Sequence, residues 1–168
     1  MIDKIITGGQ TGVDRAAHDA AIFNGLDIAG WCSKGRIDEN GIIPDKYSCL
    51  TEVAGSFASE AENYNFRTMR NIEDSDGTLV LVPAWPLPET IKDGTILTLQ
   101  HARSCNKPLL ILALNQSTAE NQASLTEWLF RNSIKALNIA GPRESSQPGI
   151  YDLSLNFLKF VLSSHHYL

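Results

Sequence analysis

A glycine-rich turn near the start of the chain is the first segment whose residues could do chemistry. The apolar pair Ile5–Ile6 leads directly into it, and a helical pattern begins at Val13. The turn consists of Gly8, Gly9, Gln10, Thr11 and Gly12. Glycine lets the backbone approach a ligand closely, and the N–H groups of a first helical turn point toward an anion. We therefore predict that this turn binds a phosphate or similar oxyanion; a purely structural turn is the alternative, because neither a GxGxxG motif nor a P-loop is present.

A second turn of the same kind follows a later strand. Asp93 precedes Gly94 and Thr95, where another helical pattern begins. Two anion sites of this type on one small sheet favour a nucleotide or a pterin as the ligand. They do not distinguish a protein that holds this ligand from one that cleaves it.

Basic residues are concentrated around these turns in an otherwise acidic chain. The net charge is −5, yet seven of the 14 basic residues fall near the first turn, in loops after strands, or on the helix before the central strand: Arg15, Lys34, Arg36, Lys46, Arg67, Arg70 and Arg143. This distribution indicates a local pocket for a small anionic ligand. We expect Lys34, Arg36 and Arg67 to converge on one phosphate, because a dianion recruits several cations. Scattered, solvated charge is the alternative.

Asp14 lies directly beside the first turn and needs an explanation of its own. A carboxylate there would repel a phosphate unless it caps the helix, pairs with Arg15, or accepts a hydrogen bond from a ribose or a base. We favour helix capping or a sugar contact.

The other titratable side chains show no spacing typical of a metal site. Those considered are His18, His101, His165, His166, Cys32, Cys49 and Cys105. His18 and His101 fall inside helical patterns without a suitable neighbour, so we predict structural roles for them. The odd number of cysteines and the absence of a CxxC spacing predict free thiols, with no metal.

The elements that must position these residues alternate regularly along the chain. Short apolar segments typical of strands buried on both faces are 4–7, 27–31, 78–82, 108–114 and 136–140. Helical patterns span 13–24, 60–74, 94–105, 121–132 and 151–164, and the longest irregular stretch is 32–53. This alternation predicts an α/β, three-layer Rossmann-like domain with a mainly parallel sheet, which binds ligands at the carboxyl ends of its strands. No linker or repeat interrupts it, so we expect residues 1–168 to form a single domain.

Composition limits the partners and the location. Hydrophobic residues make up 43% of the chain and charged residues 20%, as in soluble globular proteins. The acidic balance disfavours nucleic acid as a partner. No apolar stretch approaches ~20 residues and no signal pattern opens the chain, which favours the cytoplasm and no membrane contact. Apolar helix faces and the aromatic residues Trp85 and Trp128 favour a homo-oligomer; core positions are the alternative for both tryptophans.

Five motifs in order give the chain a resemblance to a known family. They are GGQTGVDRAA at 8–17, GWCSKGR with NGIIPDKY at 30–47, RTMRNI with SDGTLVLVP at 67–83, DGT at 93–95, and NIAGPRES at 138–145. The chain resembles the putative molybdenum carrier family over residues 5–162. This family is part of a Rossmann-like superfamily that includes the cytokinin-activating phosphoribohydrolases. The resemblance implies that the protein binds molybdenum cofactor (molybdopterin) or another nucleotide-like ligand.

The resemblance to phosphoribohydrolases also bears on catalysis. Those enzymes use an arginine before a Ser-Asp pair together with a glutamate in a GGxGTxxE turn. Arg67 stands in the matching place before Ser75 and Asp76, but Thr98 occupies the position of the glutamate after Gly94 and Thr95. Threonine cannot act as a carboxylate base or stabilise a ribosyl cation, so the sequence favours binding over catalysis and assigns no catalytic residue. A hydrolase that uses Arg67 with Asp14 or Asp93, or a nucleotide-sensing module, remains the alternative.

Overall fold

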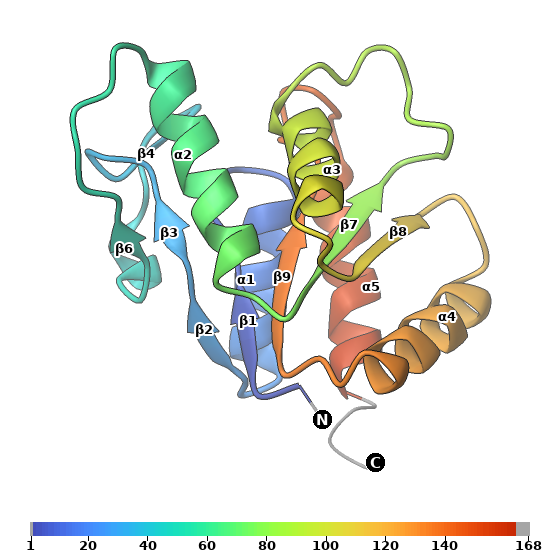
Figure 1. The fold of residues 1–168 in the computed structure, drawn as a ribbon. Coiled ribbons are helices and arrows are strands. Elements are labelled where there is room, and N and C mark those ends of the chain that lie inside the picture. The colour runs from blue at the N-terminus through green and yellow to red at the C-terminus, as the bar shows by residue number, and fades with distance from the viewer. Residues whose placement is uncertain (1, 164–168) are drawn as a thin grey trace.

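The computed structural model describes residues 2–163 and is built around a parallel sheet. The five strands of this sheet lie in the order β2-β1-β9-β7-β8, and every adjacent pair is parallel. Figure 1 shows α2 and α3 on the near face of the sheet, with α1 and α5 on the far face. The expected three-layer Rossmann-like α/β fold is therefore confirmed.

The elements follow the chain in a regular alternation. The strands of the central sheet are β1 (Lys4–Ile6), β2 (Asp27–Ala29), β7 (Gly77–Val82), β8 (Leu109–Ala113) and β9 (Ala136–Ala140). The helices are α1 (Val13–Phe23), α2 (Glu60–Glu73), α3 (Gly94–Ser104), α4 (Thr118–Arg131) and α5 (Ile150–Ser163). The predicted bounds agree with these to within one or two residues, except at α4, which begins three residues before the predicted start.

The central strand β7 shows why the sheet is covered on both sides. Leu79 and Leu81 point into the larger core, formed with residues of α1, α4 and α5. Val80 and Val82 pack on the opposite face with Leu99 of α3. Because successive side chains of a strand alternate between faces, a strand that is apolar throughout must be buried between two layers.

The predicted strand 27–31 is split in the structure. β2 ends at Ala29, and β3 (Trp31–Cys32) pairs with β6 (Thr51–Glu52) outside the central sheet. Gly30 has a φ of 145°, and a Cβ placed there would lie 1.9 Å from the Thr7 carbonyl oxygen. Only glycine permits this close approach, which turns the chain away from the sheet.

The segment predicted as irregular, 32–53, contains a small unit of its own. It comprises the hairpin β4 (Ile37–Asp38) and β5 (Gly41–Ile42), and the 3-10 helix η1 (Asp45–Tyr47). A separate core of Cys32, Ile43, Tyr47 and Leu50 holds this unit together.

Two surface features bear on the sequence predictions. Trp85 is exposed, whereas Trp128 is partly buried against the main core, so the pair does not form one surface. The exposed apolar side chains of α1 and α5 are instead Ile22, Phe23, Leu153 and Phe160.

No helix within residues 2–163 is long and apolar enough to cross a membrane. His165 and His166 lie outside the described residues.

Candidate functional site

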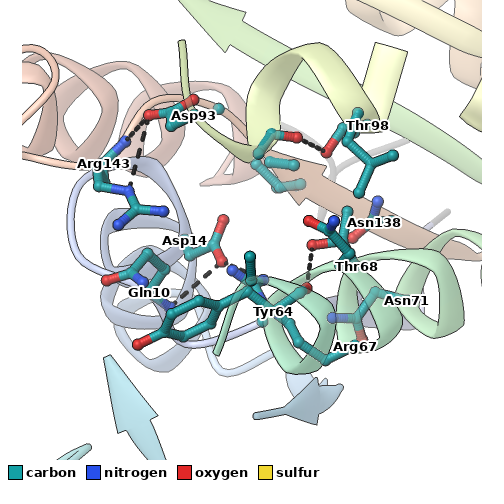
Figure 2. Close-up of a pocket in the computed structure, with 18 of the residues that line it drawn as sticks. Gln10, Asp14, Tyr64, Arg67, Thr68, Asn71, Asp93, Thr98, Asn138 and Arg143 are labelled. Carbon is teal, nitrogen blue, oxygen red and sulfur yellow. Dashed lines mark hydrogen bonds and ion pairs between the residues drawn. The ribbon is translucent and has the colours of Figure 1, made fainter. Parts of the chain in front are cut away.

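A pocket of about 420 Å³ opens at the carboxyl ends of β1 and β9. Figure 2 shows its walls, which come from the turn after β1, the inner side of α2, the start of α3 and the end of β9. The polar residues that line it are Gln10, Asp14, Glu60, Tyr64, Asn65, Arg67, Thr68, Asn71, Lys92, Asp93, Thr98, Asn138 and Arg143. Open α/β sheets bind ligands at this edge, so this pocket is the candidate site.

An ion pair between Asp14 and Arg67 forms one wall of the pocket. Arg67 Nη1 lies 2.9 Å from Asp14 Oδ2, and their side chains are 12% and 6% exposed. Asp14 Oδ2 also accepts a hydrogen bond from the Gln10 backbone N–H at 3.3 Å. Burial raises the pKa of Asp14, and the Arg67 charge and the Gln10 hydrogen bond only partly counteract this. Asp14 is therefore neither paired with Arg15 nor a simple helix cap, and its carboxyl group can carry a proton above its ordinary pH range.

Gly8 makes this ion pair possible. A Cβ at position 8 would lie 1.5 Å from Arg67 Nη1, so the guanidinium occupies the space that any side chain would fill. Gly8 thus leaves space for the guanidinium of Arg67, and this space is not open to a ligand that would approach the backbone.

The second wall contains Asp93, Arg143 and Tyr64. Arg143 donates its backbone N–H to Asp93 Oδ2 at 3.1 Å, and its guanidinium Nε lies 4.0 Å from the same oxygen. The guanidinium carbon also lies 5.8 Å from the centre of the Tyr64 ring. This wall combines a cation with an aromatic face, a combination that suits a ring-containing anionic ligand.

The deep end of the pocket is polar but uncharged. Thr98 donates to the Gly94 carbonyl, Thr68 donates to the Tyr64 carbonyl, and Asn138 donates to Thr78 of β7. Asn71 exchanges two hydrogen bonds with the Trp31 backbone, 2.7 Å to its N–H and 2.9 Å to its carbonyl. Asn71 therefore fastens α2 to β3.

The turn at residues 8–12 is largely occupied by contacts within the protein. The Thr11 N–H donates to Gln10 Oε1 at 2.9 Å, and the Val13 N–H donates to the Pro142 carbonyl at 3.2 Å. A Cβ at Gly9 would meet Leu50, and one at Gly12 would lie 2.3 Å from the Pro142 carbonyl oxygen. Of the five residues predicted there, Gly8 and Gln10 line the pocket. Gly9, Thr11 and Gly12 pack against other segments.

The start of α3 is more open. Asp93 caps the helix, with Oδ1 accepting from the Thr95 N–H at 3.0 Å and from its hydroxyl at 2.6 Å. Thr95 is buried. Gly94 lines the pocket, and a Cβ there would meet no atom of residues 2–163 within 4 Å. Of the two turns predicted to bind an anion, the turn at Gly94 is therefore the one whose glycine borders open space.

The expected convergence of Lys34, Arg36 and Arg67 is not observed. Lys34 Nζ donates to the Gly55 carbonyl at 2.7 Å, away from the pocket. The Arg36 guanidinium turns into its own loop and donates to the carbonyls of Leu50 and Tyr47 at 2.8 and 3.0 Å. Backbone carbonyls thus bind the side chains of Lys34 and Arg36, and of the three predicted cations Arg67 is the one that lines the pocket.

The remaining basic residues separate in the same way. Arg15 pairs with Asp38 at 2.7 Å, Lys46 pairs with Asp19, and Arg70 pairs with Glu73 and Asp74. Arg143 and Lys92 line the pocket. Arg143 was recognised in the sequence only as one of the clustered cations, and Lys92 was missed; its place directly before the turn at Gly94 was the available signal.

Tyr64, Thr68 and Asn138 were also missed from the sequence. The spacing of Tyr64, Arg67, Thr68 and Asn71 places them on one face of α2, and this helical pattern could have identified them. Asn138 interrupts an otherwise apolar strand, a second usable signal.

The cysteines and the described histidines, His18 and His101, do not line this pocket. Within residues 2–163, no three His, Cys, Asp or Glu side chains are grouped to hold a metal ion. The three cysteines are free, and none lines the pocket. His101 of α3 lies 3.5 Å from Glu73 of α2 and 3.4 Å from the sulfur of Cys105, the residue directly after α3.

The fold is that of a Rossmann-like α/β protein, and its candidate site is a pocket at the carboxyl edge of the sheet. The model of the circularly permutated YpsA SLOG family matches residues 5–162, and the chain belongs to this family. A crystal structure of a protein from Syntrophus aciditrophicus SB, named putative molybdenum carrier protein, is 38% identical to it. The match covers 96% of this chain and 95% of that chain, with a TM-score of 0.85. No curated protein matches the chain.

Proposed function

We propose that this protein binds an anionic, phosphorylated small molecule in the pocket beside Asp14 and Arg67. The observation that carries the proposal is the grouping of Arg67, Arg143 and Lys92 around a pocket of about 420 Å³. A pocket with cations on its walls and an uncharged polar end suits a ligand with one phosphate and one polar ring system.

A molybdopterin-type ligand is the first candidate, carried as cargo. The solved relative named putative molybdenum carrier protein supports a carrier role at the level of the family. The pocket offers Arg67, Arg143 or Lys92 to a phosphate, and Thr98 and Asn138 to a polar ring.

Native mass spectrometry of the purified protein tests this proposal. We expect an added mass that corresponds to a phosphorylated small molecule and that is lost from the Arg67→Ala variant. Arg131→Ala is the matched control, because Arg131 lies exposed on α4 and forms its ion pair with Glu127 of the same helix, away from the pocket. Retention of the ligand by Arg67→Ala, or its loss from both variants, would contradict the assignment of the pocket.

Cleavage of a nucleoside monophosphate is a second candidate function, favoured by the Asp14–Arg67 pair. Circular permutation changes the order of motifs along a chain without moving them in the fold, so an acid that acts with Arg67 need not follow the turn at Gly94. Asp14 lies 2.9 Å from Arg67, and its raised pKa suits a proton donor. In such a reaction the C–N bond at the ribose C1′ breaks, and the base leaves with a proton from Asp14. Water adds to C1′, and the proton that this water loses returns to the Asp14 carboxylate.

Incubation with nucleoside monophosphates distinguishes the two candidates. Release of free base and ribose 5-phosphate by the parent, with loss of at least a hundredfold in the Asp14→Asn variant, would establish the hydrolase. Ligand binding without release of base supports the carrier.

We further propose that the chain acts in the cytoplasm as one domain. A homo-oligomer formed through α1 and α5 is supported by the exposed Phe23 and Phe160 on these two packed helices.

A further inference from the structure

The carboxylate of Glu39 occupies a site made entirely of hydrogen-bond donors. Glu39 lies at the tip of the β4–β5 hairpin. Its carboxylate accepts hydrogen bonds from the hydroxyl groups of Thr11 and Ser145, and from the Ser145 backbone N–H at 3.1 Å. Arg143 Nη1 lies 3.8 Å from Glu39 Oε2. Two hydroxyls, one amide and one guanidinium are the donor set that proteins use to hold a phosphate or a carboxylate.

The donors come from the segments that follow two adjacent strands. Thr11 belongs to the glycine-rich turn after β1, and Arg143 and Ser145 follow β9. The site therefore adjoins the pocket at the same edge of the sheet. Arg143 connects the two, since it lines the pocket and lies between Glu39 and Asp93.

Glu39 is held in its ionised form. Burial raises the pKa of this carboxyl, but the hydrogen bonds from Ser145 and Thr11 and the charge of Arg143 outweigh burial and bring the pKa below its ordinary value. The site thus already contains an anion at neutral pH, and this anion belongs to the protein.

The side chain of Gln10 gives independent reason to expect a ligand nearby. Its Oε1 accepts from the backbone N–H groups of Thr11 at 2.9 Å and Glu39 at 3.0 Å. Because both of these partners are N–H donors, the atom of the carboxamide that faces them must be the oxygen, and the orientation of the carboxamide is therefore fixed. The Nε2 group faces away from these two donors. It is buried and has no hydrogen-bond partner within residues 2–163. Gln10 as a whole is 6% exposed and lines the pocket. A buried donor without an acceptor is costly and is explained if a ligand supplies one.

We propose that Glu39 is a built-in substitute for an acidic group of the ligand, and that an incoming phosphate or carboxylate displaces it and opens the β4–β5 hairpin. The proposal extends the proposed function by adding a second oxyanion subsite, formed by Thr11, Arg143 and Ser145, next to Arg67. The glycine-rich turn is then an anion site, as its sequence predicts, but one that the protein fills itself until the ligand arrives.

The hairpin is attached in a way that permits this opening. Its tip is joined to the rest of the protein through polar contacts of Asp38 and Glu39, while Ile42 beside it is 78% exposed. Its base is anchored separately by Ile43, which is buried with Tyr47 and Leu50. Displacement of Glu39 exchanges one carboxylate for another oxyanion and leaves this small core intact.

Titration with inorganic phosphate at constant ionic strength tests the proposal. The Glu39→Gln variant keeps the size of the side chain but removes the competing charge, so we expect it to bind phosphate roughly tenfold more tightly than the parent. Glu52→Gln is the matched control, because Glu52 is an exposed residue of the same segment; its affinity should equal that of the parent.

Hydrogen exchange on the parent protein provides a measurement that needs no variant. Saturating phosphate should accelerate amide exchange in residues 37–42, the reverse of the protection that ligands usually confer. Equal or weaker phosphate binding by folded Glu39→Gln, or protection of residues 37–42 by phosphate, would overturn the proposal. Tighter binding by Glu39→Gln, together with failure of every phosphorylated ligand to bind the parent, would support this subsite and refute the proposed function.

Discussion

Arg67 and Asp14 are 53 positions apart in the sequence, yet their charged groups meet at 2.9 Å beside the backbone of Gly8. The pair joins α2 to α1 at the pocket wall. In the structure Arg67 neutralises a buried carboxylate, and in the proposed function the same guanidinium also binds the anionic ligand.

The first prediction concerns the cost of breaking this pair. Arg67→Ala should lower the free energy of unfolding by about 3 kcal/mol, because it leaves a buried carboxylate without its counter-charge. The double variant with Asp14→Asn should recover most of this loss. Urea unfolding at pH 7 measures both, and Arg131→Ala should stay within about 0.5 kcal/mol of the parent. A double variant no more stable than Arg67→Ala would show that the lost contacts, rather than the unpaired charge, set the cost.

The second prediction compares two glycines of the pocket. Gly8→Ala should displace Arg67 and weaken binding of a phosphorylated ligand by about tenfold or more, which corresponds to about 1.4 kcal/mol or more. The Cβ of Gly94→Ala meets no atom of the described part of the chain within 4 Å, so the variant should be as stable as the parent or gain up to about 1 kcal/mol from helix propensity. Any loss of affinity in Gly94→Ala then reports a ligand close to the start of α3. Calorimetric titration and thermal melts, made on both variants, separate these effects.

The third prediction concerns acid stability. His18 is fully buried, stacks on Tyr47 with ring centres 5.0 Å apart, and its Nδ1 has no partner within residues 2–163. Burial, reinforced by the charge of Arg15, lowers the pKa of His18 from 6.5 to about 4. The unfolded chain therefore binds a proton between pH 6.5 and 4 that the folded protein does not, so stability is complete above pH 6.5 and falls as the pH is lowered.

The expected loss from this one group is about 3 kcal/mol by pH 4. Urea unfolding at intervals between pH 7 and pH 4 should show it. The His18→Gln variant should have a shallower slope over the same range, whatever its stability at pH 7. Parallel slopes for the two proteins would refute the assignment.

The fourth prediction concerns the oligomer. Light scattering should report a multiple of the 18.4 kDa chain mass. Phe23→Ser with Phe160→Ser should convert the protein to the monomer, because these side chains are 65% and 52% exposed on α1 and α5. Trp85→Ser, at an exposed residue elsewhere, is the control. A parent protein of 18.4 kDa at working concentration would end this hypothesis.

The alternation of apolar strands and helices was predictable from the sequence, because each strand buried on two faces is apolar throughout, as β7 is. Burial depends on local composition, so the five main strands and five helices, and with them the Rossmann-like class, follow from the chain alone. The start of α4 was misplaced because Thr118 and Glu120 carry no apolar signal of their own. The short pairs β3–β6 and β4–β5 escaped prediction because strands of two residues have no periodicity.

The site was predictable in part, from the two glycine-containing turns and from the arginine on the helix before the central strand. Gly8 and Gln10 follow β1, Gly94 begins α3, Arg67 lies on α2, and all four line the pocket. The partner of each charged side chain depended on the tertiary structure, because an ion pair forms wherever the fold places an opposite charge. Arg36 could reach the carbonyls of its own loop, whereas Asp14 met Arg67 across two helices, and Glu39 filled the donors around the glycine-rich turn. The sequence by itself therefore determined the layers and the edge at which the pocket opens, while the tertiary structure decided which charges face that pocket.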